Sequence, residues 1–137
     1  MVLNLEVRMN ISRGRMQSMQ SFIVEESLNS VKVFWLDQER LRAELYRTAQ
    51  KVGERDKNIV KIILFGSLAE NRAVPGSDAD ILILLKQSSA PLLERIEEWS
   101  EKFAVNFPIE LFPYTEEELD NPVVQNAMIK GITLFEQ

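Results

Sequence analysis

The chain has 137 residues, 45% hydrophobic and 27% charged, a balance typical of one globular domain. It has no cysteine and no histidine, which excludes disulfides, thiolate or imidazole metal sites and histidine acid–base catalysis. The net charge of −5 is uneven, because residues 1–60 carry 10 basic and 8 acidic side chains (+2) and residues 61–137 carry 6 and 13 (−7). A protein that grips long nucleic acid usually presents a basic stripe, so we expect a small molecule or a protein as substrate.

The N-terminal third is the least informative part of the chain. No apolar run is long enough to span a membrane, and the first residues lack the apolar core and cleavage site of a signal peptide, so we expect a cytoplasmic protein. Residues 1–35 are predicted to be an N-terminal extension of uncertain structure, since the apolar stretch from Phe22 to Trp35 favours neither helix nor strand. Residues 36–137 are predicted to form the main domain.

The pattern becomes regular after Asp37, a suitable helix N-cap. Helical spacing of apolar residues follows, at Leu41, Leu45, Ala49 and Val52. Gly53 is predicted to end this helix. The short, β-branched segment 59–65 predicts a strand, and after a polar loop the run 81–85 predicts a second strand. Because this second run is apolar on both faces, it should lie in the middle of a sheet.

A second helix is predicted to begin at Pro91, with a buried stripe formed by Leu92, Ile96, Trp99 and Phe103 and an outer i,i+4 pair of Glu98 and Lys102. The sequence then predicts a third strand at 109–112 and a short helix with a capping box of Thr115 and Glu118. A helix at 122–130 and a closing strand at 131–136 complete the pattern. This order predicts an α/β (α+β) protein, in which helices cover a small sheet.

Two short motifs lie where the first two strands meet their connecting loop. Gly66-Ser67 follows the first strand, and Asp78-Ala79-Asp80 begins the second after ten intervening residues. Side chains alternate along a strand, so Asp78 and Asp80 should share one face while Ala79 points into the core. Neighbouring carboxylates repel each other unless a cation lies between them. Oxygen ligands of this kind suit Mg²⁺ or Mn²⁺.

The other motif suits phosphate. Gly66 lets the backbone bend closely around a ligand, and the Ser67 hydroxyl with nearby backbone N–H groups can hold phosphate oxygens. A third carboxylate, Glu110, lies on the next strand, where it could share a metal ion and help activate an acceptor hydroxyl. Together these residues predict a metal–nucleotide site, in which two metal ions would clamp an in-line displacement.

The combination of Gly-Ser, ten residues, Asp-x-Asp and an aliphatic strand resembles the minimal nucleotidyltransferases of the DNA polymerase β-like superfamily, over roughly residues 37–135. The resemblance implies a small mixed sheet with flanking helices and two Mg²⁺ ions for attack on the α-phosphate of an NTP. By resemblance, Asp78 and Asp80 hold the metal ions, and Gly66 and Ser67 bind the triphosphate. The remaining candidates are Ser77 for phosphate and Glu110 for metal.

Two positions depart from the family pattern. Relatives more often have aspartate where this chain has Glu110, and many have glycine where it has Asn71. The longer Glu110 side chain can still reach a metal ion, but with different geometry. A non-glycine residue at position 71 leaves the conformation of the loop open.

The resemblance also implies a partner. Minimal nucleotidyltransferases are commonly paired with a helical HEPN protein, and in toxin–antitoxin pairs the antitoxin adds AMP to a tyrosine of the HEPN toxin. Because no appended acceptor-binding domain follows the third strand, we expect such an ATP- and Mg²⁺-dependent antitoxin, working as a homodimer or hetero-oligomer. Two alternatives stay open: an antitoxin that acts by contact alone with a vestigial site, and a small-molecule adenylyltransferase with a cationic, aminoglycoside-like substrate, which the −7 charge of residues 61–137 would attract.

Overall fold

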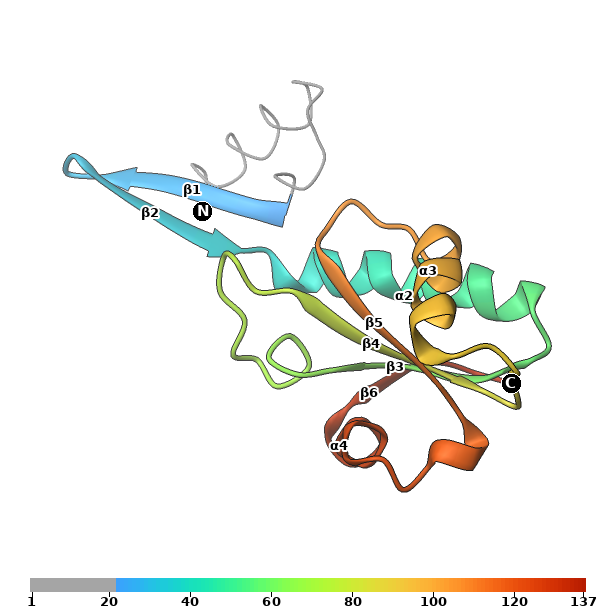
Figure 1. The fold of residues 1–137 in the computed structure, drawn as a ribbon. Helices are drawn as coiled ribbons and strands as arrows, with labels where there is room; N and C mark the ends of the chain where they lie inside the picture. Colours follow the sequence, from blue (N-terminus) through green and yellow to red (C-terminus); the bar gives the residue numbers. More distant parts are fainter. Residues whose placement is uncertain (1–21) are drawn as a thin grey trace.

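A computed structural model describes residues 22–137 and shows a small sheet flanked by helices (Figure 1). The strands are β1 (Ile23–Leu28), β2 (Val31–Leu36), β3 (Ile59–Phe65), β4 (Ala79–Leu85), β5 (Ile109–Thr115) and β6 (Ile132–Glu136). The helices are α2 (Gln38–Arg55), α3 (Leu92–Lys102), the short 3₁₀-helix η2 (Glu116–Glu118) and α4 (Pro122–Lys130). No helix among these is long and apolar enough to cross a membrane.

The main sheet has four strands in the order β5-β4-β3-β6. Strand β3 pairs antiparallel with both β4 and β6, whereas β4 and β5 are parallel and are joined by the crossover helix α3. The predicted mixed sheet is therefore confirmed, with β4 in the interior as its apolar sequence indicated. Strand β5 extends to Thr115 and includes Pro113, which is tolerated because β5 is an edge strand.

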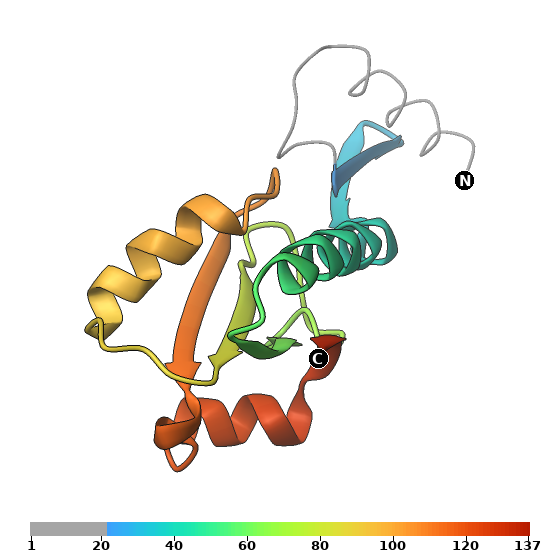
Figure 2. The same cartoon turned by 90° about the vertical axis from the view of Figure 1, so that its right-hand side faces the viewer.

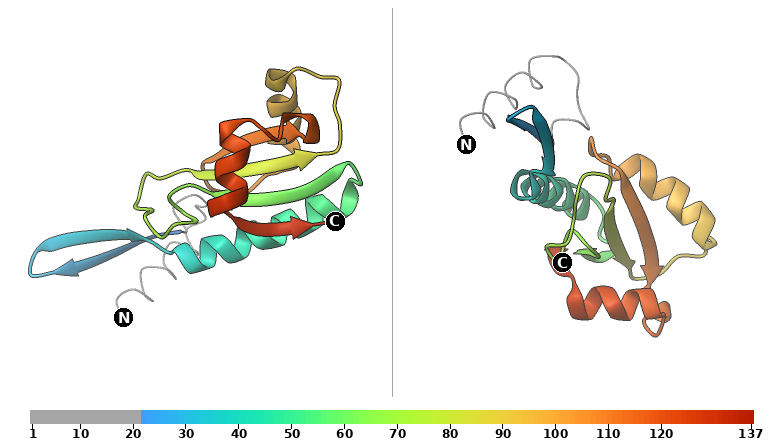
Figure 3. Two further views of the ribbon diagram at one scale, coloured as in Figure 1. Left: turned by 90° about the horizontal axis from the view of Figure 1, so that it is seen from below. Right: turned by 90° about the vertical axis from the view of Figure 1, so that its left-hand side faces the viewer.

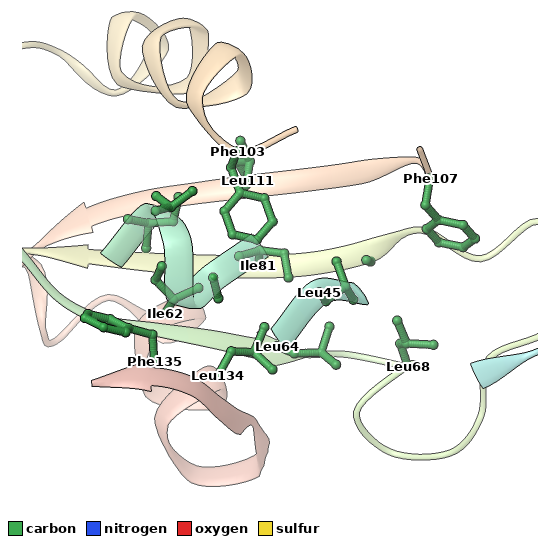
Figure 4. Close-up of a cluster of buried hydrophobic side chains, with 14 of the residues drawn as sticks. Leu45, Ile62, Leu64, Leu68, Ile81, Phe103, Phe107, Leu111, Leu134 and Phe135 are labelled. Atoms are coloured by element: carbon green, nitrogen blue, oxygen red, sulfur yellow. The ribbon is translucent and has the colours of Figure 1, made fainter. Parts of the chain in front are cut away.

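Helices cover the two faces of this sheet unequally. Helices α2 and α3 lie on one face and α4 lies on the other (Figure 2). The larger core cluster fills the first face, where Leu45 of α2 packs with inward residues of β3 and β4 such as Ile62 and Ile81 (Figure 4). The smaller cluster joins Ile63, Phe65 and Leu82 of the strands to Val124 and Ala127 of α4.

Helix α2 begins where the sequence predicted. The Asp37 carboxylate accepts a hydrogen bond from the Arg40 backbone N–H at 3.3 Å. The predicted end at Gly53 is wrong, because the helix continues to Arg55. Gly53 serves close packing instead: a Cβ atom there would collide with the Phe135 ring of β6. The glycine lets the helix lie against that strand.

The buried face of helix α3 also differs from the predicted one. Trp99 and Phe103 are buried as expected, and the outer pair of Lys102 and Glu98 is formed at 2.7 Å. Leu92 and Ile96 are only half-buried, and Arg95 occupies the buried position, with 6% of its surface exposed.

The buried guanidinium of Arg95 donates to the Pro113 carbonyl at 2.6 Å and to Glu118 at 2.9 Å, so its charge is fully partnered. Glu118 also accepts from the Thr115 backbone N–H at 2.8 Å, which confirms the predicted capping box.

The described part of the N-terminal extension is a β-hairpin. Strands β1 and β2 pair from Ile23↔Leu36 to Leu28↔Val31, and the turn residues Asn29 and Ser30 both have positive φ, as a two-residue type I′ turn requires. The hairpin extends beyond the start of α2, away from the main sheet (Figure 3). At its base, the Asp37 N–H donates to the Phe22 carbonyl at 2.7 Å. Residues 1–21, the rest of the predicted extension, lie outside the described residues.

Candidate functional site

Strand pairing brings the candidate residues to one end of the sheet. Phe65, the last residue of β3, pairs with Asp80 near the start of β4, and Asp80 pairs in turn with Glu110 near the start of β5. Gly66 and Ser67 come directly after Phe65. Phe65 and Glu110, which are 45 positions apart in the sequence, are therefore held on either side of Asp80 by backbone register.

The carboxylates face the side of the sheet that α4 covers. In β4, Ala79 and Ile81 belong to the larger cluster under α2 and α3, so Asp80 between them points to the opposite face. Glu110 precedes Leu111, another member of that cluster, and points the same way. Asp78 lies one residue before β4, and Ala79 is fully buried as the sequence predicted.

The acidic side chains at this end of the sheet repel one another. Burial raises the pKa of the Asp80 carboxyl above its ordinary value, and the negative charges of Glu110 and Asp78 raise it further. Asp80 is half-buried, whereas Asp78 and Glu110 are exposed. Within residues 22–137, no group of three or more acidic, His or Cys side chains is already converged on one point as a finished metal cage. A donor set of neighbouring, mutually repelling carboxylates fits a hard divalent cation such as Mg²⁺.

The Gly66–Ser67 turn fits closely around Asp80. Gly66 has φ +79°, in the left-handed region that glycine adopts without strain, and a Cβ atom there would collide with Asp80 Oδ2. The Gly66 carbonyl accepts from the N–H groups of Ala69 and Glu70, both at 3.1 Å. The chain thus turns tightly at the point where the Asp80 carboxylate meets the loop.

Ser77 already has a local partner. Its hydroxyl accepts from the Val74 N–H at 3.0 Å, and its own N–H donates to the Val74 carbonyl at 2.9 Å. These bonds close a turn around Pro75 and Gly76. A phosphate contact from Ser77 stays a prediction, and it would have to use the hydroxyl proton.

The structure accommodates asparagine at position 71, where many relatives have glycine. Asn71 has φ +58°, the conformation in which glycine is most at ease and which asparagine tolerates better than most residues. Its side-chain oxygen accepts from Arg42 Nη2 at 2.8 Å. The loop therefore keeps a glycine-like turn and gains a tie to α2.

Arg42 was not among the predicted site residues. Its guanidinium donates to the Leu68 carbonyl as well as to Asn71. One turn earlier in α2, Gln38 Nε2 donates to the Ala73 carbonyl at 3.3 Å. The i,i+4 spacing of these two polar residues was visible in the sequence, but their loop partners depend on how α2 packs.

Comparison with known proteins assigns the family. The family described as "Polymerase beta, Nucleotidyltransferase" matches residues 47–137, and the chain belongs to it. The predicted superfamily is thereby confirmed. None of the curated proteins compared with the chain matches it.

Several solved structures are similar. A Sulfolobus solfataricus protein provisionally described as a nucleotidyltransferase has 21% identity and a TM-score of 0.56, over 73% of this chain and 84% of that one, which shows a shared fold. A toxin–antitoxin complex with AMP-PNP has 17% identity and a TM-score of 0.47, over 67% and 73%. The complex of a tri-AMPylated Shewanella oneidensis HEPN toxin with its MNT antitoxin has 15% identity and a TM-score of 0.43, over 73% of both chains.

Proposed function

We propose that this nucleotidyltransferase transfers AMP from ATP to a hydroxyl group in a Mg²⁺-dependent reaction, and that the hydroxyl belongs to a tyrosine of a HEPN toxin paired with it in the cytoplasm. The observation that carries the chemistry is the register of β3, β4 and β5, which sets Asp80 between the Gly66 turn and Glu110. The partner is proposed from the resemblance to minimal nucleotidyltransferases.

In this proposal the acidic side chains form the metal site. Asp78, Asp80 and Glu110 would hold Mg²⁺, which when bound neutralises their repulsion and polarises phosphate oxygens. The half-buried Asp80 is fixed between the Gly66 turn and β5, so it sets the position of the site. The exposed Asp78 and Glu110 keep the freedom to adjust around the cation.

The transfer itself is an in-line displacement. Ser67 and the N–H groups of its turn orient the triphosphate. The acceptor oxygen forms a bond to the α-phosphorus while the bond to the bridging oxygen of the β-phosphate breaks, and pyrophosphate leaves. Glu110, exposed at the rim, accepts the proton of the acceptor hydroxyl. An exposed base at the sheet edge suits an acceptor that arrives on another molecule.

The decisive experiment measures transfer of label from α-labelled ATP, with Mg²⁺, to the protein encoded by the adjacent gene. Wild type is compared with Asp78→Asn/Asp80→Asn. The matched control is Glu97→Gln/Glu101→Gln, which removes two exposed charges from α3 on the opposite face of the sheet. We expect label on the partner with wild type and control, and none with the site variant.

The other outcomes separate the alternatives. Tight binding of the partner by both forms, without label, would replace the proposal with an antitoxin that acts by contact. Absence of both binding and label, with transfer to a cationic small molecule instead, would favour an aminoglycoside-type adenylyltransferase, which the charge of −5 would suit.

A further inference from the structure

Helix α2 holds the loop between β3 and β4 at several points. Gln38 binds the Ala73 carbonyl at 3.3 Å, and Arg42 binds both the Leu68 carbonyl and the Asn71 side chain, the latter at 2.8 Å. These donors lie one helical turn apart, so both reach the loop from the same face of α2. The loop is therefore tied to a rigid element as well as to its own ends.

The contacts from Arg42 involve residues next to Gly66-Ser67, the candidate phosphate-binding motif. Leu68 directly follows Ser67, and its side chain is 1% exposed, so it anchors the loop in the core. With its carbonyl oxygen held by a guanidinium, the peptide plane between Leu68 and Ala69 has one orientation. The Ala69 N–H in that plane donates to the Gly66 carbonyl at 3.1 Å. One charged side chain thereby sets the orientation of the turn that carries Ser67.

We propose that Arg42 is a positioning residue for nucleotide binding: it clamps the Gly66–Asn71 turn in the shape that receives the triphosphate, without touching the nucleotide. The inference rests on the proposed function for the identity of the ligand. Hydrogen bonds from a charged donor are stronger than neutral ones, and the Nη2 amino group of Arg42 binds both acceptors. Asn71 completes the clamp, because its left-handed conformation turns its side-chain oxygen toward Arg42.

Helix α2 carries another arginine that allows a comparison. Arg47, one turn and a residue further along α2, is exposed and pairs only with Glu44 in the described contacts. Arg47 is therefore the matched control for Arg42.

The first test needs no nucleotide. Hydrogen exchange is measured at the backbone amides of Ala69, Glu70 and Arg72, which are bonded to the carbonyls of Gly66 and Ser67. In Arg42→Ala these amides should exchange about 10-fold faster or more, as expected when charge-assisted hydrogen bonds are lost. In Arg47→Ala they should exchange as in wild type. Unchanged exchange in Arg42→Ala would overturn the clamp.

The second test measures the affinity for AMP-PNP with Mg²⁺ by calorimetry. Arg42→Ala should weaken binding about 10-fold, the factor that corresponds to the loss of charge-assisted bonds of ordinary strength. Arg42→Lys keeps the charge but lacks the fixed planar geometry of Nη2, so it should also weaken binding, whereas Arg47→Ala should not. Wild-type affinity in Arg42→Lys would mean that charge, not the clamp, matters.

A double-mutant cycle separates positioning from direct contact. Asn71→Gly keeps the left-handed backbone but removes the acceptor, and it should weaken binding less than Arg42→Ala does. The double variant should bind as Arg42→Ala, because both changes open one clamp. Additive losses would overturn the shared clamp, and no loss in Asn71→Gly would remove Asn71 from it and leave only the Leu68 contact. Absence of AMP-PNP binding by wild type would overturn the proposed function and the nucleotide role together, while hydrogen exchange would still decide whether Arg42 holds the loop.

Discussion

The two faces of the main sheet differ in how densely they are packed. The face under α2 and α3 is filled by the larger cluster of buried side chains, which runs from Leu68 at one end to Phe135 at the other (Figure 4). The face under α4 has a much smaller cluster, and its strands carry Asp80 and Glu110 at the end beyond it. Hydrophobic burial on one face supplies the stability that allows mutually repelling carboxylates to lie close together on the other.

The difference explains how a small domain can hold such a site. Burial raises the pKa of Asp80, and the negative charges of Glu110 and Asp78 raise it further, so this group of carboxylates is electrostatically unfavourable. The antiparallel and parallel pairing around β4 keeps Asp80 in place regardless, because the same strands are anchored by apolar residues on the opposite face. The candidate site and the larger hydrophobic cluster thus lie on opposite faces of a single layer of strands.

The largest effect is expected from Asp80→Asn. It should lower the rate of AMP transfer by at least about 100-fold, since a preorganised charge at the reaction centre is lost. The same change should raise the melting temperature of the metal-free protein by roughly 1–4 °C, because a disfavoured charge is removed. Transfer assays and thermal unfolding without Mg²⁺ check both. A drop in the melting temperature would show that Asp80 stabilises the fold, against the proposed division between the faces.

The next largest effect is expected on the face of the sheet under α2 and α3. Leu45 is fully buried in the larger cluster, so Leu45→Ala should lower the free energy of unfolding by about 2–5 kcal/mol through lost burial and a cavity. Ile129→Ala on α4 should change it by less than about 0.5 kcal/mol, since that side chain is 76% exposed. Urea unfolding measures both. Equal losses would mean that burial in the larger cluster is not the source of the effect.

A smaller effect is expected at Gly53, where α2 meets β6. In Gly53→Ala the added methyl group must displace the Phe135 ring, which should cost about 1–3 kcal/mol of stability despite the better helix propensity of alanine. Its exposed neighbour gives the control, because Glu54→Ala should be nearly neutral. Stabilisation by Gly53→Ala would show that the contact with β6 is loose.

The smallest effect concerns pH. The hydrogen bond from Arg95 holds the pKa of the Glu118 carboxyl below its ordinary 4.5, so the unfolded chain takes up the proton first on acidification. The stabilisation should be complete above pH 4.5 and disappear as the pH falls through the lowered folded-state pKa. Glu118→Gln should cost less than about 1 kcal/mol at pH 7, because the carboxylate is partly exposed. The difference from wild type in urea unfolding should shrink at acidic pH; a constant difference would rule out the charge as its source.

The placement of the candidate residues at one end of the sheet was predictable because it depends on strand register. The β-branched run 59–65 and the apolar run after Asp80 identified two paired strands, and the motifs at their ends had to meet. The bounds of α4 were also correct, since Pro122 begins it and Gly131 follows its end. Local sequence features, such as propensity, alternation and capping, were sufficient to predict these elements.

The features that were missed depend on contacts between distant segments. The burial of Arg95 requires a carbonyl and a carboxylate from the segment after α3, and Gly53 looked like a helix end because its contact with Phe135 is 82 residues away. The hairpin was ambiguous because the apolar residues of segment 31–36 do not alternate strictly. Arg42 belongs to the same class, since no local pattern reveals which loop a helical side chain will reach.

The double pairing of β4 has a consequence for how such a domain diversifies. Because β3 and β5 both fix its register, the position of Asp80 does not depend on the number of residues in the preceding loop. The cost of lengthening a surface loop grows only slowly with its length. Insertions or deletions around Val74 to Gly76, beyond the Arg42 contacts, would change the loop while leaving Asp80 in register with Phe65 and Glu110. The sheet fixes the position of the candidate site, and the length of this loop segment can vary without moving it.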